Sequence, residues 1–181
     1  PNDLKAYVNR GSAWMYLKNY QKAIENFNYA ILLKSDHIFA LSNRGMAYQL
    51  MGDLKKAKAD FQKAVTIDNY NTLMILNYLE TKILTNDLNN MNAYIDRAYL
   101  TARNNEEKIL TVFTHMFVNA LQKKSLGILE KEFNRLLKKK ILLQTNYDAL
   151  EVYLKKIKPS FASVDLLLNH IQRLKNPTIN L

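Results

Sequence analysis

The sequence predicts an all-α fold, built as a stack of antiparallel helix pairs. Two observations predict it. Residues recur along the chain at a shift of 34, and apolar residues continue to recur at helical spacing after that repeat fades. A fixed period of this length is typical of a solenoid, in which each helix pair packs only on its neighbours. We therefore expect one elongated α-solenoid of about ten helices.

The match at a shift of 34 residues covers both helices of the first two pairs. Asn9-Arg10-Gly11 recurs as Asn43-Arg44-Gly45. The other matched positions are Ala13 and Ala47, Trp14 and Tyr48, Lys22 and Lys56, Ala23 and Ala57, Phe27 and Phe61, and Ala30 and Ala64. A series of this length indicates repeated helix pairs rather than coincidence.

The repeated small residues favour close packing of the two helices in each pair. Gly11 and Gly45 stand in mid-helix, where glycine costs about 1 kcal/mol relative to alanine, so a close approach of the second helix is expected to compensate. Small residues seven apart lie on one face of the second helix and admit a neighbouring backbone. They are Ala23, Ala30, Ala57 and Ala64. Phe27 and Phe61 lie on the same stripe, where we expect them to fill the space between adjacent pairs.

A tight turn between the two helices of a pair is predicted at Met51-Gly52-Asp53-Leu54. Gly52 can adopt a positive φ, and the Asp53 side chain can cap the next helix. With the repeated glycines, alanines and phenylalanines, these residues resemble the tetratricopeptide repeat over residues 4–71. The resemblance implies a right-handed superhelix in which the first helix of each pair lines a concave groove.

A third, degenerate copy follows at the same shift. Asn77, Asp87-Leu88 and Ala98 match the second copy, with Asp87-Leu88 at the place of its turn and helix start. Leu79 replaces the glycine and Met91 replaces the first alanine. Because these replacements alter the helix contact, we expect the helices of this copy to pack at a changed angle.

Helical spacing beyond the repeats predicts two further antiparallel pairs, as atypical repeats or as a cap. Their helices are expected near 105–122, 125–140, 145–157 and 160–175. Pro1-Asn2-Asp3 stands where a preceding repeat would end, so we expect the natural protein to extend upstream. The expected organisation is the end of a preceding repeat over 1–3, repeats over 4–37, 38–71 and 72–104, and a helical region over 105–181.

The resemblance also implies a binding surface on the first helices. In relatives that bind peptides, an asparagine on the inner face of successive first helices hydrogen-bonds the main chain of the partner, and Asn9, Asn43 and Asn77 match that place. The alternative is that asparagine is simply common there and in this chain. The other residues expected to face inward are Lys5, Val8, Ser12, Phe39, Ser42, Met46, Leu73 and Leu76. Phe39, Met46 and Leu73 would form an apolar floor, although such residues at helical spacing are more often typical of a core.

Relatives that clamp the acidic tails of heat-shock chaperones use a different residue set. They place lysine and asparagine in the first copy, asparagine in the second, and lysine with arginine in the third. Only Asn43 fits, because Val8, Ser12, Leu73 and Asn77 stand at the other places. A carboxylate clamp is therefore not expected.

The net charge of +10 raises the alternative of nucleic-acid binding. Lysine far outnumbers arginine and asparagine is abundant, a pairing that an AT-rich genome produces without selection for binding. The alternative is a basic surface on the C-terminal half, formed by Lys131, Arg135, Lys138, Lys139 and Lys140 together with Lys155, Lys156 and Lys158. The lysine run closes a helix, where cations favour the negative end of the dipole, so a solvated face is the preferred interpretation.

Nothing in the sequence predicts chemistry. The chain has no cysteine, its three histidines are scattered, and no glycine-rich phosphate loop is present, so no metal, cofactor or catalytic site is expected. No apolar run approaches the ~20 residues that span a bilayer. The sequence leaves the compartment undecided and favours the cytoplasm. We expect a non-catalytic module that binds a protein or peptide. Self-assembly and binding of nucleic acid or another anionic surface are the alternatives.

Overall fold

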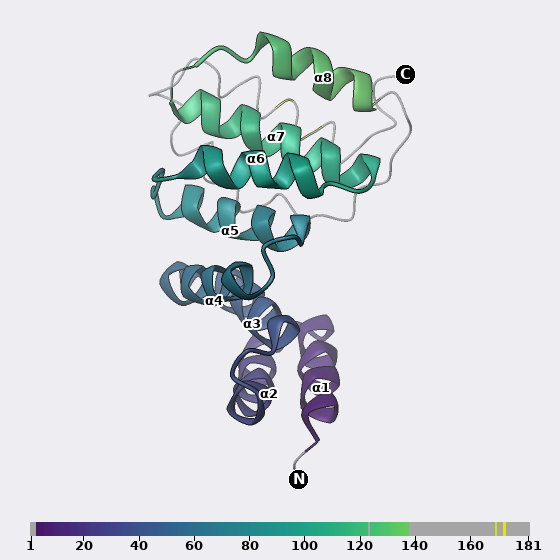
Figure 1. The fold of residues 1–181 in the computed structure, drawn as a ribbon. Helices are drawn as coiled ribbons and strands as arrows, with labels where there is room; N and C mark the ends of the chain where they lie inside the picture. Colours follow the sequence, from purple (N-terminus) through teal and green to yellow (C-terminus); the bar gives the residue numbers. More distant parts are fainter. Residues whose placement is uncertain (1–2, 123, 138–168, 170–171, 173–181) are drawn as a thin grey trace. The chain divides into compact units, whose positions relative to one another are not determined.

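The computed structural model describes residues 3–122 and 124–137, together with 169 and 172 (Figure 1). Within these residues the chain forms α-helices and no strand, which confirms the all-α fold. The helices are α1 Leu4–Tyr16, α2 Tyr20–Leu33, α3 Ile38–Leu50, α4 Leu54–Ile67, α5 Thr72–Leu84, α6 Met91–Thr101, α7 Asn105–Leu121 and α8 Gly127–Leu137. The helices expected over 145–157 and 160–175 lie outside the described residues, apart from 169 and 172.

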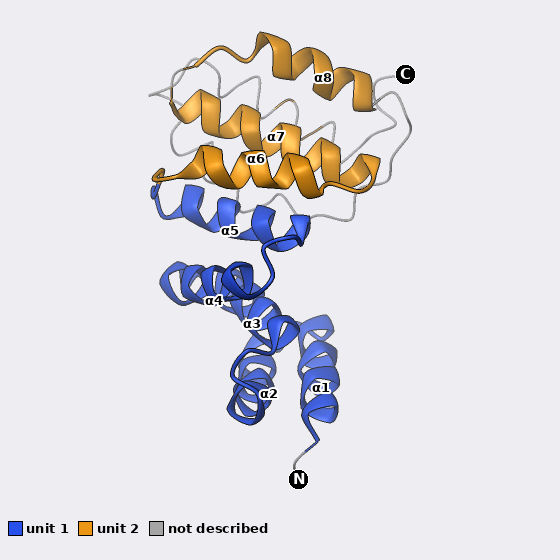
Figure 2. Cartoon of the chain, in the orientation of Figure 1, with its two compact units in different colours: residues 1–87 blue, residues 88–181 orange. Residues whose placement is uncertain are grey.

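The chain divides into two compact units, residues 1–87 and 88–181 (Figure 2). The first unit contains α1 to α5, and the described part of the second contains α6 to α8. The division falls inside the range 72–104 that the sequence predicts for the third repeat.

Helices of the first unit pack in chain order. Each of α2, α3, α4 and α5 contacts the helix before it, and α1 also contacts α3. The two helices of a pair meet at the mid-helix glycines. A Cβ atom on Gly11 would lie 2.6 Å from the Phe27 ring, and one on Gly45 would lie 3.1 Å from the Phe61 ring. Each ring therefore occupies the space that the glycine of its own pair leaves open.

The turn inside each pair is also repeated. Lys18, Gly52 and Asn86 have φ values of 57°, 83° and 55° and stand 34 residues apart. After each of them, a backbone N–H donates back to the last turn of the preceding helix; the Asn86 turn, for example, is closed by Asp87 N–H to Lys82 C=O at 2.8 Å. The sequence predicts this turn only at Gly52, because lysine and asparagine do not require a positive φ.

Most described helices begin at a side chain that accepts from a backbone N–H three residues later. The capping residues are Asp3, Asn19, His37, Asp53, Asn71 and Asn104. In His37 the acceptor is Nδ1, 3.1 Å from the N–H of Ala40. These caps satisfy donors that the first turn of a helix leaves open, which explains why the helices start where they do.

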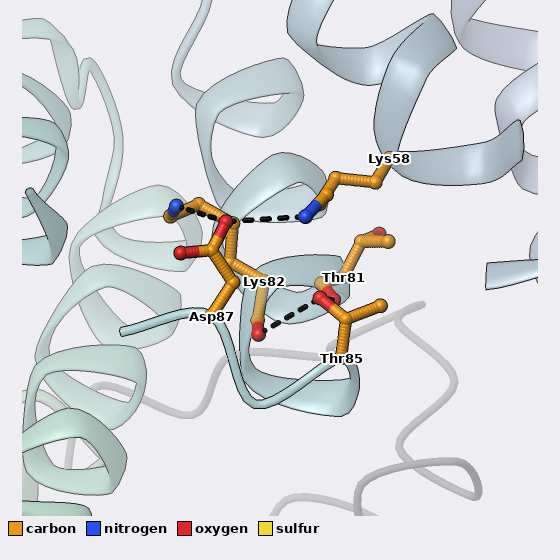
Figure 3. A network of polar contacts seen from close by, with 5 residues as sticks. All are labelled: Lys58, Thr81, Lys82, Thr85 and Asp87. Carbon is orange, nitrogen blue, oxygen red and sulfur yellow. Dashed lines mark hydrogen bonds and ion pairs between the residues drawn. The ribbon is translucent and has the colours of Figure 1, made fainter. Parts of the chain in front are cut away.

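The third copy departs from the pattern at the start of its second helix. In the second copy α4 begins at Leu54 with Asp53 as its cap, whereas α6 of the third copy begins at Met91. Asp87 instead forms ion pairs with Lys82 at 2.8 Å and Lys58 at 3.2 Å, as Figure 3 shows. Lys82 stands where the second copy has Tyr48, and Asp87 supplies the counter-charge of its buried ammonium.

The second unit has a core of its own. Helix α7 packs on α6 and on α8. Phe113 of α7 lies 6.4 Å from Phe117 and 5.9 Å from Phe133 of α8, centroid to centroid, and all three rings are fully buried. Ile95 and Ala98 of α6 are buried as well.

Candidate functional site

The three repeated asparagines lie at one register on α1, α3 and α5. Asn9 is exposed, and Asn43 and Asn77 are partly exposed. Within the described residues, none of their carboxamides makes a hydrogen bond. Helix α1 contacts α3, and α3 is joined to α5 by a bond from Thr81 Oγ1 to Gln49 Oε1 of 3.2 Å. The carboxamides therefore stand on neighbouring helices with their donors and acceptors unused.

Three large apolar side chains accompany these asparagines without entering the core. Phe39 is 64% exposed, Leu73 is 48% exposed and Met46 is 39% exposed. Buried residues of the same helices, such as Leu41 and Leu79, have no more than 1% of their surface in water. The apolar surface of the three side chains thus remains free to contact another molecule.

The other residues predicted to face inward differ among themselves. Lys5 and Ser12 are exposed, and the Ser12 hydroxyl donates to the Val8 carbonyl at 3.0 Å. Ser42 and Leu76 are each only 7% exposed, so placing them on an open surface was wrong. They share one repeat position with the half-buried Val8, and that position serves the packing between helices.

Sequence reasoning missed a carboxylate on this surface. At the shift of 34, Ser12 and Met46 are followed by Glu80, which lies on α5 three residues after Asn77. Glu80 accepts a hydrogen bond from Gln49 of α3, while its Oε1 atom is buried and has no hydrogen-bond partner among the described residues. Burial raises the pKa of Glu80 to about 7, and the bond from Gln49 opposes that rise. The repeat period aligns Glu80 with Ser12 and Met46. Because these three residue types are unlike, the alignment did not mark the position as a candidate site.

The arginine that follows each of the first two asparagines holds its helix in place. Arg44 donates to both carboxylate oxygens of Asp60 on α4, each at 2.7 Å, and to Asn28 of α2 at 2.7 Å. In the first copy, Arg10 donates to Asn26 at 2.5 Å. Because these bonds tie the first helix to the second, they fix the orientation at which the asparagines are presented.

The predicted basic surface is only partly described. Lys131 is exposed on α8, and Arg135 pairs with Glu132 at 2.6 Å, which raises the pKa of the guanidinium. The other members lie outside the described residues; they are Lys138, Lys139, Lys140, Lys155, Lys156 and Lys158. One of the two described cations is therefore already neutralised by its neighbour.

Histidines in the described region serve structural contacts. His37 caps α3, and His115 of α7 lies 3.2 Å from the hydroxyl of Tyr99 on α6. Burial lowers the pKa of His115 and raises the pKa of Tyr99 to about 12. Over the described ranges, no group of three or more histidine and carboxylate side chains is placed to hold a metal ion. Over those same ranges, no helix has the length and apolar character needed to cross a membrane.

Comparison with known proteins agrees with the repeated helix pairs of the fold. Family models of the tetratricopeptide repeat match residues 4–37 and 38–71. No curated protein sequence matches the chain. Among solved structures, YrrB, described as a TPR protein with an unusual peptide-binding site, has a TM-score of 0.65 and 17% sequence identity. That match covers 98% of this chain and 89% of YrrB.

A structure of pilF from Pseudomonas aeruginosa has a TM-score of 0.63 and 13% identity, over 94% of this chain and 66% of that one. At such identities, likeness shows the fold alone. Two consecutive family matches, the glycine and phenylalanine contacts and the recurring turn agree on one assignment. Residues 4–71 match the tetratricopeptide-repeat family as two consecutive repeats.

Proposed function

We propose that the chain binds an extended segment of a partner protein across α1, α3 and α5. The binding region, called the asparagine surface below, is formed by Asn9, Phe39, Asn43, Met46, Leu73 and Asn77. One observation carries the proposal: three carboxamides recur at one register on neighbouring helices, and none of them is engaged within the described part of the chain.

Main-chain recognition follows from the chemistry of the carboxamide. Each one donates and accepts, so it can pair with a peptide group whatever side chain that residue carries. An extended segment leaves its peptide groups open to such pairing, in contrast to a helix, which has satisfied most of its own. The carboxamides would hold the backbone of the partner.

Apolar contact supplies the remaining affinity. Phe39, Met46 and Leu73 keep between 39% and 64% of their surface in water. Covering them with apolar side chains of a partner gains about 25 cal/mol for each Å² removed from water. Methionine adapts its shape to different partners, which suits a surface that recognises backbone first. YrrB, similar in fold, is described as having a peptide-binding site, which is consistent with this use of the fold.

Capture of partners from a lysate of the source organism tests the proposal. The immobilised chain is compared with a variant carrying Asn9→Ala, Asn43→Ala and Asn77→Ala. A matched control removes three exposed carboxamides elsewhere, with Gln21→Ala and Gln62→Ala on the second helices and Asn92→Ala on α6. Circular dichroism verifies that both variants remain folded.

We expect the asparagine variant to lose partners that the control retains. Each lost hydrogen bond is worth about 1 kcal/mol, so three together lower affinity by roughly two orders of magnitude. Equal capture by the folded asparagine variant and the control would contradict the proposal.

A further inference from the structure

We infer that the asparagine surface selects partner segments that carry a lysine or arginine, and that Glu80 is the residue that reads this charge. The inference rests on the proposed function and names the chemistry of its partner. Its starting point is register: Glu80 occupies the repeat position that the exposed Ser12 and Met46 hold in the first two copies.

Glu80 lies within reach of a segment bound to Asn77. Leu73, Asn77 and Glu80 follow at spacings of four and three on α5, so their side chains leave the helix on one face. Three residues advance a helix by about 4.5 Å, little more than one residue of extended chain. Glu80 is partly exposed but its Oε1 is buried, so a partner residue held at Asn77 reaches this oxygen only when the Glu80 side chain turns outward.

One oxygen of the Glu80 carboxyl receives no hydrogen bond from any described residue. Gln49 donates to Glu80 from its amide nitrogen, since its Oε1 accepts from Thr81. The second carboxylate oxygen, Oε1, is buried without a partner among the described residues. Buried acceptors in native structures nearly always have a donor, so this one requires an explanation.

The cations of α3 and of α5 itself are paired with other side chains. Arg44 of α3 binds Asp60 and Asn28, and Lys82 of α5 binds Asp87. Glu80 therefore has no cationic partner on either helix. A partner's ammonium or guanidinium would supply both the missing donor and the missing charge, whereas a hydroxyl would supply only the donor.

The titration of Glu80 agrees with an unmet need for a cation. Burial raises the pKa of this carboxyl to about 7, so an isolated negative charge is disfavoured there. A lysine or arginine placed against it would lower that pKa, because an opposite charge favours the ionised form.

Selection from a phage-displayed library of random decapeptides tests the inference. The library is panned on the whole chain, on Glu80→Gln, and on Glu25→Gln, which changes an exposed glutamate of α2 in the same way. We expect the wild-type chain and Glu25→Gln to enrich peptides with lysine or arginine at one fixed position, and Glu80→Gln to lose that preference.

A double-mutant cycle then separates charge reading from a structural effect. The most enriched peptide and its lysine→methionine variant are titrated against the wild-type chain and Glu80→Gln. Each single change should weaken binding about tenfold, and the two together should cost little more than either one, because both remove the same contact. Independent effects, or peptides enriched without any preference for basic residues, would overturn the inference.

The proposed function and the selection for a basic residue can fail separately. Peptides that depend on Asn9, Asn43 and Asn77 but ignore Glu80 would leave the proposed function standing and remove the charge selection. Peptides that bind the asparagine variant as well as the wild-type chain would remove the proposed function and this inference with it. If Glu80→Gln does not fold, the lysine→methionine peptide on the wild-type chain decides the matter: unchanged affinity overturns the inference.

Discussion

Glu80 bears on both the stability of the fold and the binding that we propose for it. Its carboxyl is held by Gln49 on one side and lacks a partner among the described residues on the other. An arrangement optimised for stability alone would place an uncharged side chain there, since an uncompensated buried charge is costly. A cost retained at a binding surface is a reason to look for a ligand that removes it.

Replacement by glutamine should therefore change how stability depends on pH. The folded pKa of Glu80, about 7, lies above its ordinary value of 4.5, so the folded chain binds the proton more tightly than the unfolded chain. Its contribution is fully present below about pH 4.5 and is lost as pH rises through about 7. Between pH 4 and pH 8, the stability of wild type minus that of Glu80→Gln should fall by about 3 kcal/mol. Urea denaturation across this range measures the difference, and a constant difference would contradict the expectation.

Lys18 gives a second prediction at the residue scale. It adopts φ 57° at the place where the second copy has Gly52. A left-handed conformation costs a non-glycine residue about 1 kcal/mol, so Lys18→Gly should raise the free energy of unfolding by roughly that amount. Lys34→Gly is the matched control, because Lys34 has φ −146° and gains nothing from glycine. Thermal denaturation that shows equal effects of the two changes would speak against this account.

At the scale of elements, the first two helix pairs share a contact between glycine and phenylalanine, but they leave different amounts of space for a side chain at the glycine. A Cβ atom on Gly11 would lie 2.6 Å from the Phe27 ring, whereas one on Gly45 would lie 3.1 Å from the Phe61 ring. Alanine gains about 1 kcal/mol of helix propensity at either place, and overpacking costs about 1–3 kcal/mol. We expect Gly11→Ala to lower the free energy of unfolding clearly and Gly45→Ala to change it by less than about 1 kcal/mol. Chemical denaturation of both variants tests the order.

The ion pairs of Asp87 give a further prediction. Lys82 has only 5% of its side chain in water and depends on Asp87 for charge. Asp87→Ala should cost about 3 kcal/mol, because it leaves a buried ammonium uncompensated. Lys82→Met in the same chain should recover most of that loss, since it removes the charge in need of a partner. Failure of the double variant to recover stability in denaturant titrations would show that Asp87 acts through another contact.

The helices also show how much of the structure could be predicted from the sequence. The period of 34 and the glycine, alanine and aromatic positions were sufficient to predict the helices of the first unit and their order. The Lys82–Asp87 ion pair was not predictable by alignment, because the second copy has Tyr48 at the place of Lys82. Ser42 and Leu76 were misplaced for a related reason: helical period indicates a face, while burial depends on the neighbouring helix. Glu80 escaped notice because serine, methionine and glutamate share no chemistry.

At the scale of the molecule, stability should vary along the stack. In solenoids, each unit is stabilised by its own contacts and by those with its neighbours. Helix α3 is covered by α2 and α4, and its Ala40 and Ala47 are fully buried. The matching Ala6 and Ala13 of α1 are exposed.

Native-state hydrogen exchange should therefore proceed from the first helix inwards. In the 181-residue chain we expect amides in the middle of α1 to exchange faster than those in the middle of α3. The difference in opening free energy should amount to about 1 kcal/mol or more. Uniform protection of the two helices would indicate that the first unit opens all at once.

The recurring turn has a consequence for how such a chain can change length. Lys18, Gly52 and Asn86 adopt nearly the same backbone although their side chains are unrelated, so the joint between helices is a property of the main chain. A gene segment that encodes one repeat can be duplicated or deleted without the need for a new type of turn between the helices. Copying residues 38–71 in tandem would add one asparagine to the row and, under the proposed function, would lengthen the partner segment that the row binds. The length of the binding surface would therefore change by one whole repeat at a time.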